Sequence, residues 1–191
     1  MTRRRIVLLA CALAVAPFAL GGDATDSILK SAKLATVLIK GRETYFGQSS
    51  GSGFVMRKDG NTLYVATNAH VVDDPGDAAP TVVFRSGQKD EISLPGKVVA
   101  LDRDRDLAIL KVTASGPVSV IPLSPKARIK ETSPIYVLGF PFGQMLSVTA
   151  GNPSITVAKG AVSSIRKDEG GKVARIQIDA TVNPGNSGGP V

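Results

Sequence analysis

Three side chains in the sequence have types and surroundings that suit nucleophilic catalysis. Ser187 lies in the run "NPGNSGGP", the single histidine His70 lies just after the apolar run "LYVAT", and Asp106 immediately precedes the apolar run "LAIL". A serine hydroxyl becomes a good nucleophile when a base takes its proton, and histidine exchanges a proton near neutral pH. A carboxylate behind the histidine holds its tautomer and stabilises the imidazolium. The three residues therefore predict a catalytic arrangement in which Ser187 attacks, His70 moves the proton and Asp106 supports His70.

The glycines around Ser187 favour a small site for negative charge. Glycine permits backbone angles that residues with side chains resist, so the N–H groups of Gly185, Asn186 and Ser187 can point to one spot. Such a concave group of amides would hold the negative oxygen of a tetrahedral intermediate. We therefore predict these three residues as the oxyanion hole.

Each of these residues, taken alone, also has a plainer interpretation. A lone histidine is more often a packed or surface residue than a catalytic one, and a glycine–serine run is often only a turn. The acids Asp102, Asp104 and Asp106 alternate with arginines, which is also typical of a solvated turn. Asp106 differs from the other two because an apolar strand is expected to begin immediately after it.

The order of the three residues along the chain separates known serine-hydrolase layouts. The "GNSGG" run fits the elbow of α/β-hydrolases, but there the acid and the histidine follow the serine, and only four residues follow Ser187. A subtilisin layout requires the acid before the histidine, and no aspartate upstream of His70 leads into a buried strand. The order His70, Asp106, Ser187 is that of the chymotrypsin type.

The runs "TNAHVV", "DRDLAILKV" and "NPGNSGGPV" together resemble the trypsin-like serine proteases, and within them the disulfide-free HtrA (Deg) branch. The run "VLGFPFGQMLSVTAG" is similar to the same branch, and the likeness covers roughly residues 30–191. The resemblance implies that Ser187 is the nucleophile, His70 the general base and acid, and Asp106 the residue that orients His70. It also implies an oxyanion hole made by the amides of Gly185 and Ser187.

The resemblance extends to the substrate pocket. In trypsin-like enzymes the base of the primary specificity pocket lies six residues before the serine, which here is Thr181, followed by Val182. No acid stands there to pair with a lysine or arginine of a substrate. We therefore expect cleavage after small or medium apolar residues.

Short apolar segments separated by turn residues indicate a mostly β protein. Six expected strands in the first half cover residues 35–40, 51–57, 62–67, 81–85, 96–102 and 107–112. Four in the second half cover residues 134–140, 146–151, 154–166 and 172–179. Residues 26–34 predict a short helix with Asp26 as its N-cap.

Together with the resemblance, this pattern predicts an all-β fold of two six-stranded antiparallel β-barrels with the active site between them. We place a protease domain at residues 25–191, with a first barrel at about 30–113, a link at about 114–133 and a second barrel at about 134–191. Trypsin-like folds have further strands after the serine, so the second barrel is expected to be incomplete and the chain to be cut short after Val191.

The first 24 residues have the layout of a secretory signal. Three arginines precede an apolar run from Ile6 to Leu20, which is short for a membrane span, and small residues follow. We predict cleavage near Ala24, no stable membrane span afterwards, and a periplasmic or extracellular location. A retained anchor, or lipid attachment at Cys11, remains an alternative. Cys11 is the chain's one cysteine, so a chain cleaved near Ala24 would hold no cysteine.

Composition argues against several other classes of protein. The net charge is +7, but the basic residues are scattered and not interleaved with aromatics, so no nucleic-acid partner is expected. With one histidine and one cysteine, we expect no zinc site and no cofactor. The predicted function is an exported serine endopeptidase acting on unfolded or damaged proteins, with an oligomeric state that the sequence does not indicate. The alternative is an inactive or incomplete protease-fold module that binds polypeptides.

Overall fold

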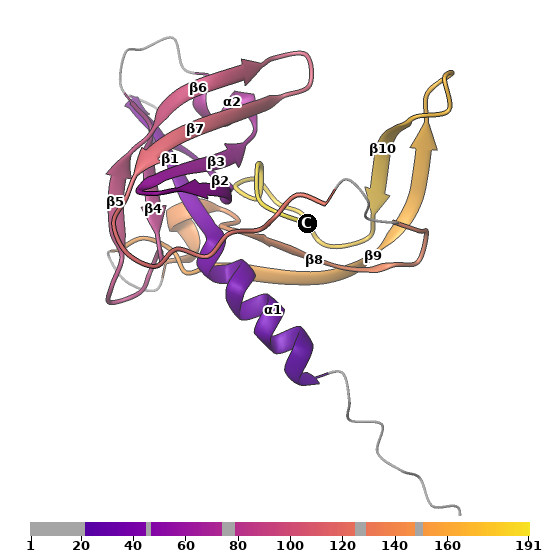
Figure 1. Cartoon of the computed structure of the whole chain (residues 1–191), viewed down its shortest axis with the longest axis horizontal. Helices are drawn as coiled ribbons and strands as arrows, with labels where there is room; N and C mark the ends of the chain where they lie inside the picture. The colour runs from indigo at the N-terminus through magenta and orange to yellow at the C-terminus, as the bar shows by residue number, and fades with distance from the viewer. Residues whose placement is uncertain (1–21, 45–46, 74–78, 125–128, 148–150) are drawn as a thin grey trace, which may run out of the picture.

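The computed structural model describes residues 22–44, 47–73, 79–124, 129–147 and 151–191. A curled seven-stranded antiparallel sheet forms one side of the molecule, and a three-stranded sheet forms the other (Figure 1). The chain's C-terminus lies between the two sheets in this view (Figure 1).

The larger sheet has the strand order β5-β4-β1-β2-β3-β7-β6. Its strands are β1 (Thr36–Thr44), β2 (Gly47–Asp59), β3 (Thr62–Thr67), β4 (Thr81–Phe84), β5 (Ile92–Pro95), β6 (Lys97–Asp102) and β7 (Leu107–Thr113). The two edge strands, β5 and β6, are consecutive in the chain and separated only by Gly96. This bend joins the two edges, so the sheet curls into a barrel of six strands when 92–102 is counted as one kinked strand.

Alternating burial along the strands explains why the sheet curls around a core. In β3 every second residue is buried, and β7 shows the same alternation. The buried face of the sheet gathers mainly β-branched and leucine side chains, which fit a pleated surface. The core residues are Val37, Ile39, Val55, Leu63, Val65, Val71, Val82, Phe84, Leu110 and Val112. This core holds rigid the strand ends from which His70 and Asp106 extend.

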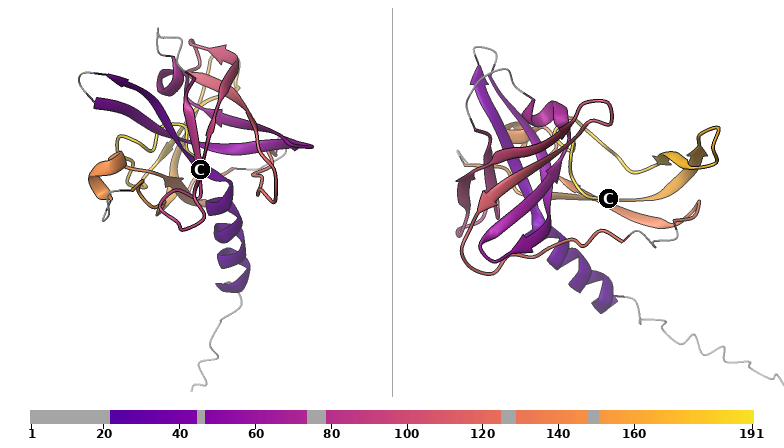
Figure 2. Two further views of the ribbon diagram at one scale, coloured as in Figure 1. Left: turned by 90° about the vertical axis from the view of Figure 1, so that its left-hand side faces the viewer. Right: turned by 45° about the horizontal axis from the view of Figure 1, so that its top comes forward.

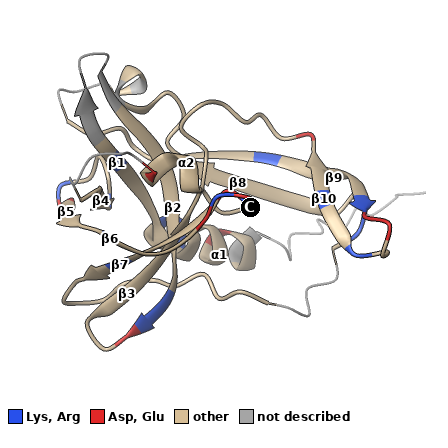
Figure 3. Cartoon of the chain, turned by 90° about the horizontal axis from the view of Figure 1, so that it is seen from above, with Lys and Arg blue, Asp and Glu red and all other residues tan. Residues whose placement is uncertain are grey.

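The smaller sheet contains β8 (Pro134–Gly139), β9 (Thr156–Lys167) and β10 (Val173–Ile178), in the order β10-β9-β8. A short 3₁₀-helix, η1 (Gly143–Leu146), follows β8. The β9–β10 hairpin extends away from the curled sheet (Figure 2). Basic and acidic side chains both lie near the tip of this hairpin (Figure 3).

Two helices accompany the sheets. The helix α1 (Gly22–Ala35) leads into β1 and projects from the body of the molecule (Figure 2). The helix α2 (Ala69–Val72) is a single turn that follows β3 and carries His70. Among the described residues, no helix is both long and apolar enough to cross a membrane.

The predicted all-β, trypsin-like fold with an incomplete second barrel is confirmed. Some elements differ from the sequence predictions. The helix begins at Gly22, so Asp26 lies inside it and is not the N-cap. Strand β5 was not predicted, because the polar turn at 85–91 obscures its short apolar pattern. The strand predicted at 146–151 is wrong at Leu146, which ends η1. Residues 148–150 lie outside the described part.

Candidate active site

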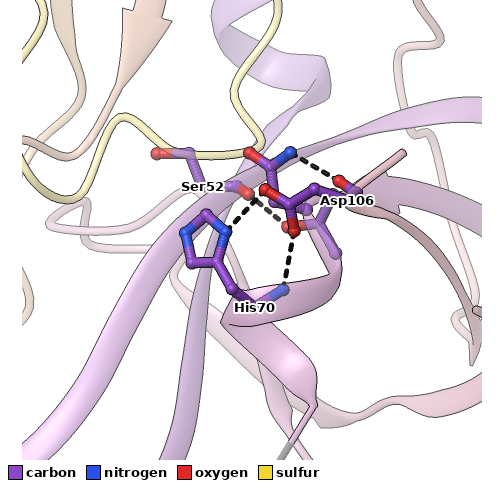
Figure 4. Close-up of polar contacts among 5 residues, drawn as sticks. Ser52, His70 and Asp106 are labelled. Carbon is purple, nitrogen blue, oxygen red and sulfur yellow. Dashed lines mark hydrogen bonds and ion pairs between the residues drawn. The ribbon is translucent and has the colours of Figure 1, made fainter. Parts of the chain in front are cut away.

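His70 and Asp106 form a two-point contact at one end of the curled sheet (Figure 4). The ring Nδ1 of His70 lies 2.8 Å from Oδ2 of Asp106. The backbone N–H of His70 donates to the other carboxylate oxygen, Oδ1, at 2.9 Å. Both oxygens of Asp106 therefore face His70, and an Nδ1–H donor leaves Nε2 as the proton acceptor of the ring.

Local backbone conformation places Asp106 for this contact. Its φ is +54°, in the left-handed region that aspartate and asparagine tolerate better than other side-chain-bearing residues. The side-chain amide of Asn68 donates to the Asp106 carbonyl at 2.7 Å and ties the end of β3 to the turn before β7. The pair is therefore held by two neighbouring strands, which also pair directly along their length.

The contact changes the acidity of Asp106. The pKa of this carboxyl is lowered from its ordinary value, mainly by the hydrogen bond from the His70 backbone N–H. Partial burial acts in the opposite direction, and the His70 ring lowers the pKa further. The carboxylate form is therefore the form that the folded protein favours at neutral pH.

The loop that carries Ser187 packs against the same sheet. The carbonyl of Ser187 accepts a hydrogen bond from the Ser52 backbone N–H of β2 at 2.8 Å. A Cβ added to Gly188 would meet the Ser52 carbonyl and the Thr67 hydroxyl, and would lie 2.8 Å from the Asn68 nitrogen. The residue after Ser187 thus lies against the chain just before His70. Within the described part of the chain, the Ser187 hydroxyl itself makes no hydrogen bond.

Four consecutive carbonyls of this loop accept hydrogen bonds, three from other segments and one from within the loop. Their donors are, in order, Phe142 N–H to Pro184, Ser52 hydroxyl to Gly185, Gly189 N–H to Asn186, and Ser52 N–H to Ser187. In a trans peptide the N–H points away from the carbonyl of the preceding residue, and none of the described peptide bonds is cis. The amides of Gly185 and Ser187, which donate no hydrogen bond within the described residues, therefore face away from these donors.

Asn186 departs from the sequence prediction. Its amide donates to the Asn183 carbonyl at 3.0 Å, within the turn that precedes Ser187. That N–H is therefore already used and does not face the same way as its two neighbours. The turn depends on Gly185, whose φ is +97°. Within the described residues the amides of Gly185 and Ser187 donate no hydrogen bond, and their role as an oxyanion hole stays a prediction.

Thr181 and Val182 lie between β10 and this turn, and both are exposed. Neither residue lines an apolar hollow of about 790 Å³ that the described residues form. That apolar hollow is bounded by α1, residues 120–122 and the strands β8–β10, and it does not include His70, Asp106 or Ser187. The assignment of Thr181 and Val182 to the substrate pocket therefore stays a prediction.

The sequence analysis missed Ser52 and Asn68, which contact the loop of Ser187 and the turn of Asp106. Asn68 is part of the quoted run "TNAHVV", two residues before the histidine. Ser52 lay within an expected apolar strand, and its flanking glycines in "GSG" were the available signal. Among the described residues, no group of three or more histidine, cysteine, aspartate or glutamate side chains is arranged to hold a metal ion.

The curled sheet, the smaller sheet and the His70–Asp106 pair beside a glycine-rich serine loop define a chymotrypsin-like protein. The family described as the trypsin-like peptidase domain matches residues 51–191, and the chain belongs to this family.

Within the family, the chain is similar to HtrA-like proteins. It is 38% identical over 152 residues to a protein named "Serine protease HtrA-like" from Staphylococcus aureus strain USA300, covering 74% of this chain and 18% of the relative. The same figures hold for the relative in strain NCTC 8325 / PS 47. The crystal structure of the serine endoprotease from Yersinia pestis matches 86% of this chain and 51% of that chain, with a TM-score of 0.65 and 26% identity. The chain thus spans about a fifth of these curated relatives and half of the solved chain.

Proposed function

We propose that the chain is a serine endopeptidase domain whose nucleophile is Ser187. The observation that carries the proposal is the two-point contact of Asp106 with His70, at 2.8 and 2.9 Å, beside the loop of Ser187. Such a contact fixes a histidine in one tautomer and one orientation, which a merely solvated pair does not require. Membership of the trypsin-like peptidase family supports the same assignment.

The proposed chemistry assigns each of these residues a task. His70 Nε2 takes the proton of the Ser187 hydroxyl as that oxygen attacks a peptide carbonyl. The proton then passes from His70 to the leaving amine, and Asp106 stabilises the imidazolium in between. The negative oxygen of the intermediate is held by the amides of Gly185 and Ser187. In the second half of the reaction, water attacks the acyl-serine through the same proton transfers, which releases the acid product and restores the Ser187 hydroxyl.

The substrate class is part of the proposal. Thr181 and Val182, in the segment before the serine, carry no charge that would pair with a basic substrate side chain. On this ground we propose cleavage after small or medium apolar residues of unfolded proteins. We also retain as proposals the signal at residues 1–24 and export to the periplasm or the exterior. The protease domain at 25–191, with a first barrel at about 30–113, a link at about 114–133 and a second barrel at about 134–191, is likewise a proposal. Residues 1–21 lie outside the described part.

The test of this function is hydrolysis of an unfolded protein such as casein by purified residues 25–191 and three variants. Ser187→Ala and His70→Ala are expected to abolish cleavage, because each removes a group that takes part in every turnover. Ser86→Ala, a buried hydroxyl elsewhere, serves as the control and should cleave. Cleavage by either of the first two variants at the parent's rate would refute the assignment.

A second candidate function is polypeptide binding without turnover, which the apolar hollow favours. Within the described structure β8 and β10 are the edges of their sheet, and unpaired edges can add an extended strand. A chain that only binds should delay aggregation of an unfolded protein as well after Ser187→Ala as before. Hydrolysis that depends on Ser187 would rule out this function as the sole activity.

A further inference from the structure

Ser52 lies in β2 of the curled sheet, and two of its hydrogen bonds reach the loop that carries Ser187. Its side chain is 0% exposed. Its hydroxyl accepts a hydrogen bond from the Phe140 amide at 3.0 Å and donates one to the Gly185 carbonyl at 2.6 Å. Its backbone N–H donates to the Ser187 carbonyl at 2.8 Å. One residue of the first barrel thus holds the two carbonyls that flank Asn186.

The hydroxyl acts on one peptide group in particular. The peptide between Gly185 and Asn186 is held at both ends, because its carbonyl accepts from Ser52 and its N–H donates to the Asn183 carbonyl. This peptide lies between the two peptides that carry the Gly185 and Ser187 amides. Its orientation therefore sets the angle between those two N–H groups.

Packing around Ser52 leaves room for a small residue only. A Cβ added to Gly139 would lie 2.8 Å from the Ser52 hydroxyl, and one added to Gly189 would lie 3.2 Å from the Ser52 Cβ. A Cβ at Gly51 would lie 3.2 Å from the Ser187 carbonyl. The close approach of β2 to the loop therefore requires glycine on three sides, and serine is a residue that fits there and still supplies a hydroxyl.

We infer that Ser52 is a positioning residue, which fixes the Gly185–Asn186 peptide and thereby aims the Gly185 and Ser187 amides at one oxyanion. The inference rests on the proposed function, since it assigns a task to the same oxyanion hole. Ser52 is buried and does not touch the substrate. Its effect is on the stabilisation of the transition state and not on substrate binding.

The matched variants are Ser52→Ala and Ser86→Ala. Ser86 is also buried, at 3% exposed, and its hydroxyl also donates to a backbone carbonyl, that of Pro153, at 2.7 Å. Both variants lose a buried hydroxyl that bonds a carbonyl of another segment, so both are expected to lower the melting temperature. Only Ser52→Ala changes a contact of the Ser187 loop.

The first measurement is the second-order rate of Ser187 labelling by a fluorophosphonate, together with kcat and KM for a peptide substrate. Ser52→Ala is expected to lower the labelling rate and kcat by about tenfold or more, since misplacing an oxyanion donor is nearly as harmful as removing it. KM should change less than about twofold, and Ser86→Ala should keep the parent's values. A parent rate in Ser52→Ala would overturn the inference while leaving the proposed function intact.

A second measurement does not depend on activity. Amide hydrogen exchange at Asn186 should rise about tenfold in Ser52→Ala and not in Ser86→Ala, because the peptide loses its anchor. If the parent is not labelled, the proposed function fails, and this exchange rate then decides the inference separately. Unchanged exchange at Asn186 would overturn the positioning role.

Discussion

Asp106 uses both of its carboxylate oxygens on a single residue. Oδ1 accepts from the His70 backbone and Oδ2 from the ring, so neither oxygen can rotate away without losing a bond. This arrangement fixes the ring plane and leaves Nε2 available on the opposite edge of the imidazole. At the scale of the residue, orientation of His70 is thus the main contribution of Asp106.

Asp106→Asn tests this contribution. Asparagine tolerates the φ of +54°, and its oxygen can still accept from the His70 backbone. Its NH₂ would then face Nδ1 and force the ring proton onto Nε2, which is the wrong tautomer for a base. We expect kcat to fall by about 10⁴-fold with little change in KM.

The control for this variant is Asp104→Asn, two residues away. Asp104 is exposed, and its carboxylate makes no hydrogen bond within the described residues. Its activity should equal that of the parent. Equal activity of Asp106→Asn and Asp104→Asn would show that Asp106 does not act on His70.

The lowered pKa of Asp106 also predicts a pH dependence of stability. Because the folded pKa lies below the ordinary value of about 3.9, the contacts of the carboxylate stabilise the fold above that pH. This stabilisation is lost as the pH falls through the lower folded pKa. The difference in unfolding free energy between the parent and Asp106→Asn should therefore shrink from pH 6 to pH 3. Denaturant unfolding at several pH values measures it, and a difference that grows on acidification would contradict the prediction.

Residues with a proposed part in the chemistry were easier to single out in the sequence than residues that support them. His70, Asp106 and Ser187 stood in motifs at strand ends, and the chain order distinguished the layout. Ser52 acts through contacts to residues more than 130 positions away, which no local pattern contains. The Asn186 amide was assigned to the oxyanion because a glycine-rich run does not reveal which N–H closes the turn.

At the scale of elements, glycines allow the Ser187 loop to approach β2 and β3. Gly188 has a φ of +81°, and a Cβ there would collide with the Ser52 carbonyl and the Thr67 hydroxyl. The loop is therefore fixed against β2 and β3 both by hydrogen bonds from Ser52 and by close packing at Gly188. Its position depends on the middle of β2 and on the end of β3.

Gly188→Ala and Gly171→Ala form a matched pair that separates these effects. Gly171 has a similar φ of +76°, but a Cβ there would meet nothing within 4 Å. Gly171→Ala should cost about 1–2 kcal/mol through backbone strain alone. Gly188→Ala should cost roughly 2 kcal/mol more and slow fluorophosphonate labelling strongly, because the loop must move. Urea unfolding measures the first effect, and equal losses in the two variants would contradict close packing at Gly188.

Strand prediction succeeded where burial alternates and failed where tertiary contacts decide. Strand β3 begins and ends where predicted, and its alternation is complete. Strand β5 is mostly exposed and is formed through its pairing with β4. The turn after β8 contains Phe142 at a φ of +58°. Phenylalanine rarely adopts this left-handed conformation, so the sequence does not predict the turn.

At the scale of the whole molecule, the Ser187 loop is bonded to the larger sheet through the Ser52 N–H, and an apolar hollow lies elsewhere. The Leu138 amide of β8 donates to the Pro190 carbonyl, and both residues line the hollow. Ile176 of β10 also lines it and is 42% exposed. Contiguous apolar surfaces of several hundred square ångströms often mark interaction sites, so we expect this hollow to bind apolar groups.

The hollow should bind an apolar fluorescent dye. Ile176→Lys places a charge in its wall and is expected to weaken dye binding by about fivefold. Val173→Lys, on the same strand at 56% exposure but outside the hollow, serves as the control. Fluorescence titration measures both, and equal affinity in the two variants would show that the dye binds elsewhere.

The most direct test of the account is the mass of the chain after reaction with a fluorophosphonate. Only a serine that is activated by a histidine beside an oxyanion hole reacts readily with this reagent. We predict one adduct per chain, mapped to Ser187 by peptide mass and absent in Ser187→Ala and His70→Ala. A chain that remains unlabelled, or an adduct that persists in Ser187→Ala, would contradict the assignment of Ser187 as the nucleophile.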